Sequence, residues 1–173
     1  MACVYYTAAS LDGYVADEHA SLQWLVTRDI DATGPFAIDP FLASVGALVM
    51  GADTYEWILA HQPGDWMYSQ PSWVMTHRPQ IIAAGHPVQT FAGDAAELFP
   101  TLRDAAGDRH VWVVGGGNVA GQFVRAGLVD EMIVSYAPCT LGAGSPVLPI
   151  RSEWQLVDTA RNADFVCAHW RKA

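Results

Sequence analysis

The segment 111–130 constrains the fold more than any other part of the chain. It begins with four apolar residues, Val-Trp-Val-Val, which predict a buried strand. Three consecutive glycines follow, and then Asn118, a residue type that caps helix N-termini. Apolar residues then recur at helical spacing as far as Gly127, which stands where a helix-ending glycine is expected. The segment therefore predicts a strand, a glycine turn and a helix.

A turn of this kind can bind phosphate. Glycine has no Cβ, so a ligand can approach the backbone closely, and the helix that opens there presents free N–H groups and its positive dipole end. The alternative is a tight turn without a ligand. A Rossmann fingerprint could be placed on Gly115, Gly117 and Ala120, but a Rossmann turn comes early in its domain and its acidic residue ends the next strand. Asp130 instead begins the next apolar run, so we expect a nucleotide-phosphate turn of another type.

Length and cysteine content favour one domain, residues 1–173, in the cytoplasm. The three cysteines are widely spaced and do not suggest a disulfide framework. The N-terminus lacks the basic and apolar regions of a signal peptide, and no apolar stretch is long enough to span a membrane.

The charge balance bears on partners. The net charge of −9 argues against nucleic acid and anionic membrane surfaces as partners. Apolar residues make up 51% of the chain, so we expect a sizeable core. Charged residues make up only 16%, below the typical quarter, so we also expect self-association, as a homodimer.

The order of apolar runs predicts the α/β class, with about eight strands and four helices. Strands alternate with helices at first and a hairpin closes the chain, which favours a mixed, mostly parallel sheet with flanking helices and a C-terminal antiparallel hairpin. Besides the segment above, the predicted strands are residues 3–9, 46–50, 72–76, 85–91, 131–137, 154–159 and 165–170, and the predicted helices are 39–44, 53–60 and 94–106.

Three other strand ends carry polar residues. Gly51 ends one strand before a predicted helix, where Asp53 fits an N-cap, and the two glycine turns could face one crevice. The run Thr76-His77-Arg78 could hold a phosphate or be an ordinary exposed turn. Asp12 fits either an Asx-turn or a polar group at the ligand-binding end of the first strand.

Metal and hydrolase chemistry are not indicated. The six histidines form no zinc-binding spacing, and Cys167 with His169 lacks a matching pair. Ser145 lies outside a Gly-x-Ser-x-Gly nucleophile elbow.

Five motifs together resemble the dihydrofolate reductase-like superfamily, specifically the bacterial branch with the C-terminal reductase domain of the riboflavin-biosynthesis enzyme RibD. Their order and spacing span essentially the whole chain. The motifs are Ser-Leu-Asp-Gly at 10–13, Met-Gly-Ala-Asp-Thr-Tyr-Glu at 50–56, Thr-His-Arg at 76–78, the glycine turn with Gly-Leu-Val-Asp-Glu at 127–131, and Pro-x-x-x-Gly-x-Gly at 138–144.

The resemblance implies a three-layer fold and NADPH as cofactor, with NADH as the alternative. We therefore expect hydride to pass to a small planar substrate resembling a pterin, a pyrimidine or a flavin precursor, in a crevice near Asp12 as the catalytic candidate, with Trp24 and Ser135 as substrate contacts. The implied cofactor contacts are Gly116, Gly117, Asn118 and Val119 at the pyrophosphate, Gly51, Asp53 and Thr54 at a second phosphate turn, Thr76, His77 and Arg78 at the adenosine 2′-phosphate, and Ala8, Val15 and Ala16 beside the nicotinamide.

Three positions depart from the family pattern. Ala52 replaces an arginine that contacts the cofactor, which leaves Arg78 as the main cation for a 2′-phosphate. Tyr14 stands where the riboflavin branch has a lysine, so a phosphoribosyl substrate is not supported. The acid that binds a pterin ring has no clear counterpart, since Asp39 fits a helix cap better. The alternative function is therefore a nucleotide-binding or ligand-sensing protein of the same fold without turnover.

Overall fold

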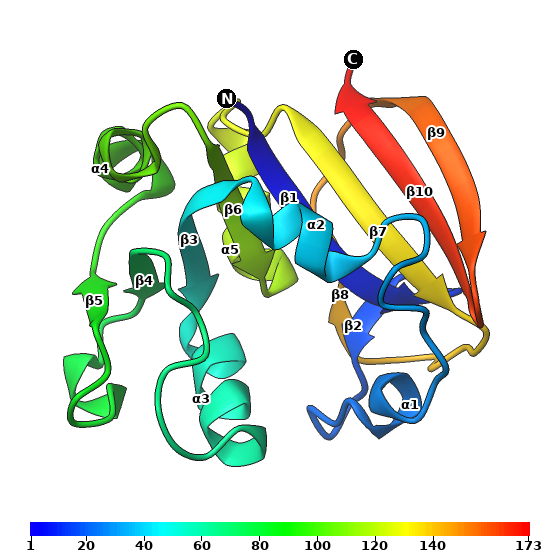
Figure 1. Cartoon of the computed structure of the whole chain (residues 1–173), viewed down its shortest axis with the longest axis horizontal. Coiled ribbons are helices and arrows are strands. Elements are labelled where there is room, and N and C mark those ends of the chain that lie inside the picture. Colours follow the sequence, from blue (N-terminus) through cyan, green and yellow to red (C-terminus); the bar gives the residue numbers. More distant parts are fainter.

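An eight-stranded sheet forms the centre of the molecule in the computed structural model, which describes residues 1–173 (Figure 1). The strand order is β5-β4-β3-β6-β1-β7-β10-β9. Neighbours from β5 to β7 are parallel, and β10 is antiparallel to both of its neighbours. The strands are β1 (Cys3–Ser10), β3 (Val45–Gly51), β4 (Ser72–Met75), β5 (Val88–Phe91), β6 (His110–Gly115), β7 (Glu131–Ala137), β9 (Trp154–Asn162) and β10 (Phe165–Lys172).

Helices cover the sheet, and a small two-stranded ribbon lies at its lower edge in Figure 1, where β1, β3 and β7 end. None of the helices is long and apolar enough to cross a lipid bilayer. The helices are α1 (Gln23–Val26), α2 (Ile38–Ala43), α3 (Ala52–His61), α4 (Ala95–Ala106) and α5 (Gly117–Arg125), with a 3-10 turn η1 (Pro79–Ile81), and the ribbon pairs β2 (Tyr14–Ala16) with β8 (Ser145–Pro146).

Alternating side chains divide the core into two layers, one on each face of the sheet. In β1, Tyr5 packs with α4 and α5 on one face, and Tyr6 packs with α2 and α3 on the other. In β3, Val49 belongs to the first layer and Leu48 to the second. Both faces of the central strands are therefore buried, as their nearly continuous apolar sequences predict.

The predicted α/β class is confirmed, including the mostly parallel sheet and the C-terminal antiparallel pair. The sequence missed α1 and the β2–β8 ribbon because both are too short for periodicity to show. Gly127 ends the last helix as expected, since its φ is +74° and the N–H of Leu128 donates to the carbonyl of Phe123.

The predicted helix caps are wrong at three N-termini. Gly51 caps α3, Gly116 caps α5 and Ala37 caps α2, and none of them provides a side-chain cap. Asp53, Asn118 and Asp39 lie instead in the first turns of their helices. At α3 and α5 the helix starts earlier because the chain passes from the glycine straight into helical geometry, and α2 starts directly after the extended Ala37.

Candidate functional site

The N-termini of α3 and α5 lie side by side at the ends of the adjacent parallel strands β3 and β6. Met50 pairs with Gly115 in the sheet, and a Cβ placed on Gly51 would lie 3.8 Å from the backbone nitrogen of Gly116. Because both caps are glycines, no side chain occupies the first N–H groups of either helix. Two positive helix ends therefore converge on one place, which suits an anion.

The glycine turn is open at two of its three positions. A Cβ on Gly115 or Gly116 would meet nothing nearer than the hydroxyl of Thr54, at 3.9 Å in each case. Gly115 also has a φ of +140°, which side-chain-bearing residues rarely adopt. The Thr54 hydroxyl lies over this turn and makes no hydrogen bond within the chain, so a ligand at the turn would find a free donor there.

Gly117 is required for a different reason. A Cβ at this position would overlap the Pro146 carbonyl oxygen and lie 2.7 Å from that of Val147. The glycine therefore lets the β8 segment pack on the start of α5, and this packing alone excludes a side chain here. Any substitution at Gly117 would disturb that packing, so its effect could not be assigned to a bound phosphate.

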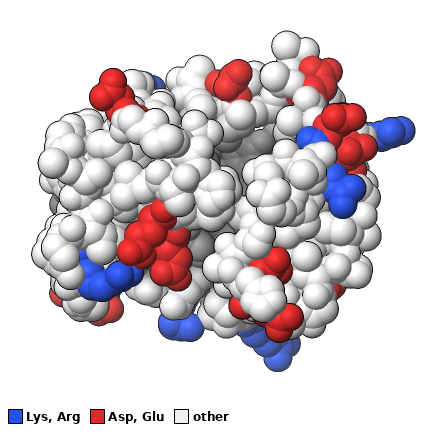
Figure 2. Space-filling view, turned by 90° about the horizontal axis from the view of Figure 1, so that it is seen from below, with Lys and Arg blue, Asp and Glu red and all other residues white.

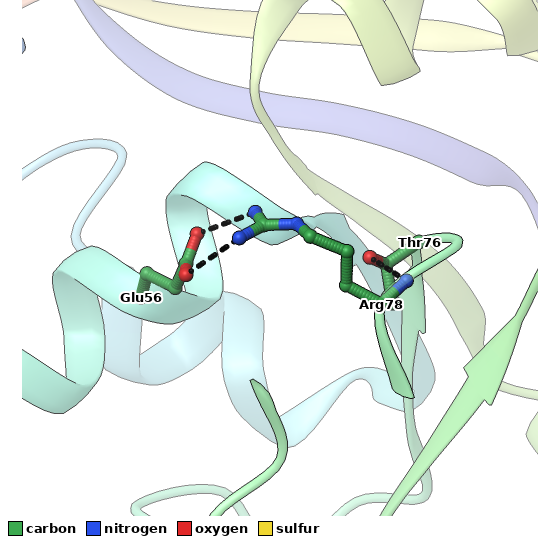
Figure 3. A network of polar contacts seen from close by, with 3 residues as sticks. All are labelled: Glu56, Thr76 and Arg78. Atoms are coloured by element: carbon green, nitrogen blue, oxygen red, sulfur yellow. Dashed lines mark hydrogen bonds and ion pairs between the residues drawn. The ribbon is translucent and has the colours of Figure 1, made fainter. Parts of the chain in front are cut away.

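The turn after β4 ties itself to α3. The Thr76 hydroxyl accepts a hydrogen bond from the Arg78 N–H at 3.0 Å, and the Arg78 guanidinium reaches across to Glu56 with two bonds of 3.2 and 2.8 Å (Figure 3). Hydrogen bonding and charge attraction from Glu56 raise the pKa of Arg78, and the nearby Asp53 adds to the effect. The guanidinium predicted to hold a phosphate thus already has a carboxylate partner.

A hollow of about 590 Å³ lies beside the glycine turn, between α5, the start of α4 and the ends of β4 and β5. It includes Thr76, His77 and Asn118, which the sequence had suggested. Polar residues of α4 and α5 that the sequence analysis did not identify complete the lining of the hollow. Asp94 and Glu97 could have been found from their capping-box spacing, and Gln122 lies one helical turn after Asn118. The additional polar lining residues are Asp94, Glu97, Gln122 and Arg125.

Asp12 holds a distant loop to the end of β1. Its carboxylate accepts hydrogen bonds from the Ser10 hydroxyl at 2.6 Å and from the N–H groups of Leu141 and Gly142 at 3.0 and 2.7 Å. The Ser10 bond, with the two backbone bonds, lowers the pKa of Asp12 to about 2. The group is therefore an ionised carboxylate at neutral pH, which suits positioning of the loop and does not suit proton donation. Its catalytic role stays a prediction.

The two predicted substrate contacts, Trp24 on α1 and Ser135 on β7, lie near the same buried residue, Cys167. The Trp24 indole N–H donates to the Ser21 carbonyl at 3.1 Å, and its ring packs on the cluster of Ala137, Phe165 and Cys167. The Ser135 hydroxyl is buried and lies 3.3 Å from the Cys167 sulfur. Both polar groups are thus engaged within the chain, and their contact with a substrate stays a prediction.

The β2–β8 ribbon connects the predicted nicotinamide contacts to the glycine turn. Val15 and Ala16 lie on β2, and β8, which pairs with β2, leads into the segment that packs on Gly117. Ala8 lies on β1 near its end, paired with β7. The ribbon therefore carries Val15 and Ala16 toward the start of α5, and the contact of Ala8, Val15 and Ala16 with a nicotinamide stays a prediction.

Figure 2 views the molecule from the side where β1, β3 and β7 end. The surface is hollowed along its middle, and a cluster of acidic side chains borders the hollow.

Comparison with known proteins identifies the family. The family model described as RibD C-terminal domain matches residues 61–163, more than half of the chain. The chain belongs to the RibD C-terminal domain family. The matched range includes the turn after β4, the glycine turn and the 138–144 loop, whereas the motifs near residues 10 and 51 precede it.

Three similar proteins each match more than nine-tenths of the chain. The "Uncharacterized protein YwjB" of Bacillus subtilis (strain 168) is 27% identical and covers 98% of this chain and 97% of its own length. The riboflavin biosynthesis protein RibD of Corynebacterium ammoniagenes is 27% identical over 92% of this chain, which spans only 48% of that protein. A crystal structure of a riboflavin biosynthesis protein from Shewanella sp. PV-4 has a TM-score of 0.85, 25% identity, and covers 100% of this chain and 99% of its own.

More distant RibD structures share the fold. Acinetobacter baumannii RibD superposes with a TM-score of 0.68 at 19% identity, covering 100% of this chain and 58% of its own. A Thermotoga maritima deaminase/5-amino-6-(5-phosphoribosylamino)uracil reductase has a TM-score of 0.66 at 14% identity, with 99% and 56% covered. The fold is thus that of a RibD reductase domain, consistent with the dihydrofolate reductase-like superfamily.

Proposed function

We propose that this protein is a reductase that uses a reduced nicotinamide dinucleotide to reduce a small planar ring. The observation that carries the proposal is the pair of helix N-termini without side-chain caps, α3 and α5, which meet over an open glycine turn. Two backbone anion sites this close suit the two linked phosphates of a dinucleotide. Membership of the RibD C-terminal domain family supports a reductase.

Residues of the chain would then hold and orient the cofactor. The first N–H groups of α3 and α5 and the Thr54 hydroxyl would bind the pyrophosphate, and Ala8, Val15 and Ala16 would flank the nicotinamide and keep water away. When bound, the dinucleotide supplies the hydride, and the protein supplies orientation. The family resemblance implies NADPH, and the charges at the adenosine end decide between NADPH and NADH.

A planar ring without a phosphoribosyl group suits this chain as substrate. The Thermotoga maritima neighbour is described as a reductase of a phosphoribosylamino-uracil, so a pyrimidine-like ring is the chemical class that the family suggests. Tyr14 takes the place of a lysine expected for the phosphoribosyl substrate, and the chain carries a net charge of −9. Both features disfavour an anionic substrate group while leaving the ring itself acceptable.

A second candidate is a ligand-binding protein of the same fold without turnover. The polar groups of Asp12, Trp24 and Ser135, which were expected to face the substrate, are all engaged within the chain. Turnover separates the two candidates, because both predict dinucleotide binding.

The proposal is tested by titrating the protein with NADH and NADPH and following quenching of tryptophan fluorescence. Substituting Gly116→Ala places a methyl group over the open turn, so we expect dinucleotide affinity to fall by at least about tenfold, the order expected when a charged hydrogen bond is lost. Gly121→Ala is the matched control, because it lies one turn further along α5, where a Cβ would meet Ile150 at an ordinary 3.6 Å. Equal affinity of the two variants would remove the glycine turn from the binding site.

The same preparation is then assayed with pterin, pyrimidine and flavin-precursor rings for loss of the reduced nicotinamide absorbance. Oxidation of the cofactor with one of these rings supports the reductase. Tight binding without oxidation across the panel favours the second candidate.

A further inference from the structure

We infer that the adenosine end of the site takes an unphosphorylated ribose, so that the protein uses NADH in preference to NADPH; this inference rests on the proposed function. It departs from the cofactor that the family resemblance implies. The contact that points to it is the pairing of Arg78 with Glu56, beside Asp53.

The hollow next to the glycine turn is the place for the adenosine half. A pyrophosphate over Gly116 lies at the start of α5, and the hollow continues from there along Asn118 and Gln122 to the end of β4 at Thr76 and His77. Its volume of about 590 Å³ is in the range of small-molecule sites, which run from roughly 300 to 1,000 Å³. A nucleoside extending from the turn would therefore bring its ribose close to the residues after β4.

Arg78 does not present a free positive charge to that ribose. Its guanidinium donates two hydrogen bonds to the two carboxylate oxygens of Glu56, which lies on the second turn of α3 (Figure 3). The pair is exposed, at 49% and 42% for the two side chains, so it adds little stability and could open. Opening would leave both carboxylates of α3, Asp53 and Glu56, next to any incoming phosphate.

The charges around this end sum to a negative value. Two guanidinium groups face four carboxylates, and Ala52 stands at the helix position where the family resemblance implied a further arginine. A 2′-phosphate carries between one and two negative charges at neutral pH, so it is repelled here. A ribose 2′-hydroxyl instead donates well to a carboxylate, which is the usual arrangement in sites that take NADH. The charged groups are Arg78 and Arg125 against Asp53, Glu56, Asp94 and Glu97.

The first measurement compares the dissociation constants of NADH and NADPH for the unmodified protein by tryptophan fluorescence, at low and at high salt. We expect NADH to bind more tightly. We also expect added salt to narrow the difference, because screening weakens repulsion of the 2′-phosphate. A site built to attract the 2′-phosphate would instead lose NADPH affinity relative to NADH affinity as salt is added.

The second measurement uses Glu56→Gln, which removes one negative charge and frees the guanidinium of Arg78. We expect NADPH affinity to rise by about tenfold, the order that one unit charge near contact contributes at a protein surface, and NADH affinity to change by less than about twofold. Glu153→Gln is the matched control, since Glu153 also pairs with an exposed arginine, Arg151, but lies by β9 at the opposite edge of the sheet from β4. It should change neither constant.

Each outcome separates the inference from the proposed function. Tighter binding of NADPH than NADH by the unmodified protein, or an equal response of both cofactors to Glu56→Gln, would overturn the inference while leaving a dinucleotide-dependent reductase in place. Absence of binding of either dinucleotide would overturn both. Preference for NADH, with a gain in NADPH affinity that is specific to Glu56→Gln, would support the inference.

Discussion

Thr54 offers a direct test of the phosphate site because its hydroxyl has no task in the fold. It lies 3.9 Å from the positions that a Cβ would take on Gly115 and Gly116, and it makes no hydrogen bond within the chain. Thr54→Val replaces the hydroxyl by a methyl group of similar size. The substitution therefore changes what the turn offers a ligand and leaves the packing almost as it was.

The expected loss follows from one charged hydrogen bond. A hydrogen bond to a phosphate oxygen contributes about 1.5–3 kcal/mol, so the dissociation constant of the dinucleotide should rise by a factor of roughly 10 to 150. The free energy of unfolding should stay within about 0.5 kcal/mol of the original, because no bond inside the chain is broken.

Two assays separate these effects. Tryptophan fluorescence titration gives the dissociation constant, and urea unfolding gives the stability of the same preparation. Thr90→Val is the control, since Thr90 is exposed on β5 and its hydroxyl also has no partner within the chain. If Thr54→Val bound dinucleotide as tightly as Thr90→Val, the hydroxyl would not contact the phosphates and the placement of the pyrophosphate would be wrong.

Two further substitutions test side-chain hydrogen bonds that hold loops to the sheet. Asp12→Asn should lower the thermal midpoint at neutral pH. The pKa of Asp12 is lowered from 3.8 to about 2 in the folded state, so the ionised carboxylate stabilises the fold above pH 3.8 and this stabilisation is lost as the pH falls from 3.8 to about 2. The midpoints of the variant and the unmodified protein should therefore converge near pH 2. A constant difference down to that pH would contradict the loop clamp. Asn162→Ala removes three buried hydrogen bonds, to the N–H and carbonyl of Asp31 and the carbonyl of Pro35, and should cost about 3 kcal/mol, or roughly 6–12 °C in Tm, measured by calorimetry. Asn118→Ala is the control, since Asn118 is exposed and its substitution should change Tm little. An equally small change for Asn162→Ala would show that its hydrogen bonds do not hold the loop at residues 31–35 in place.

The strand–glycine–helix unit could be predicted because every part of it is local. The apolar run, the glycines and the helical spacing as far as Gly127 all lie within one short segment, and the structure keeps them as a strand, a turn and a helix. The caps were misassigned for the same local reason. Asp53 and Asn118 are good cap residues by type, but the strand ends at glycines that already have cap geometry, so the polar residues move into the first helical turn.

The site is less predictable because its contacts join residues far apart in sequence. Glu56 and Arg78 are 22 residues apart, and their pairing depends on how α3 lies over the end of β4. Asp12 binds backbone groups 129 and 130 residues away, so no local pattern distinguishes this clamp from an Asx-turn. Contact of Gly117 with a phosphate stays a prediction, but no local pattern could show that its lack of a side chain also admits the carbonyls of Pro146 and Val147.

The central position of the first strand affects how the protein can assemble. β1 lies between β6 and β7, so that Cys3 pairs with Val111 and Val4 with Glu131. Neither neighbour exists until most of the chain has been synthesised, and the β2–β8 ribbon closes later still. Pairings of such long range make folding slow and leave the apolar first strand exposed on the nascent chain. The crevice that would bind the ring therefore cannot form before the chain through Pro146 has been synthesised, and no N-terminal fragment that ends before Pro146 can contain it.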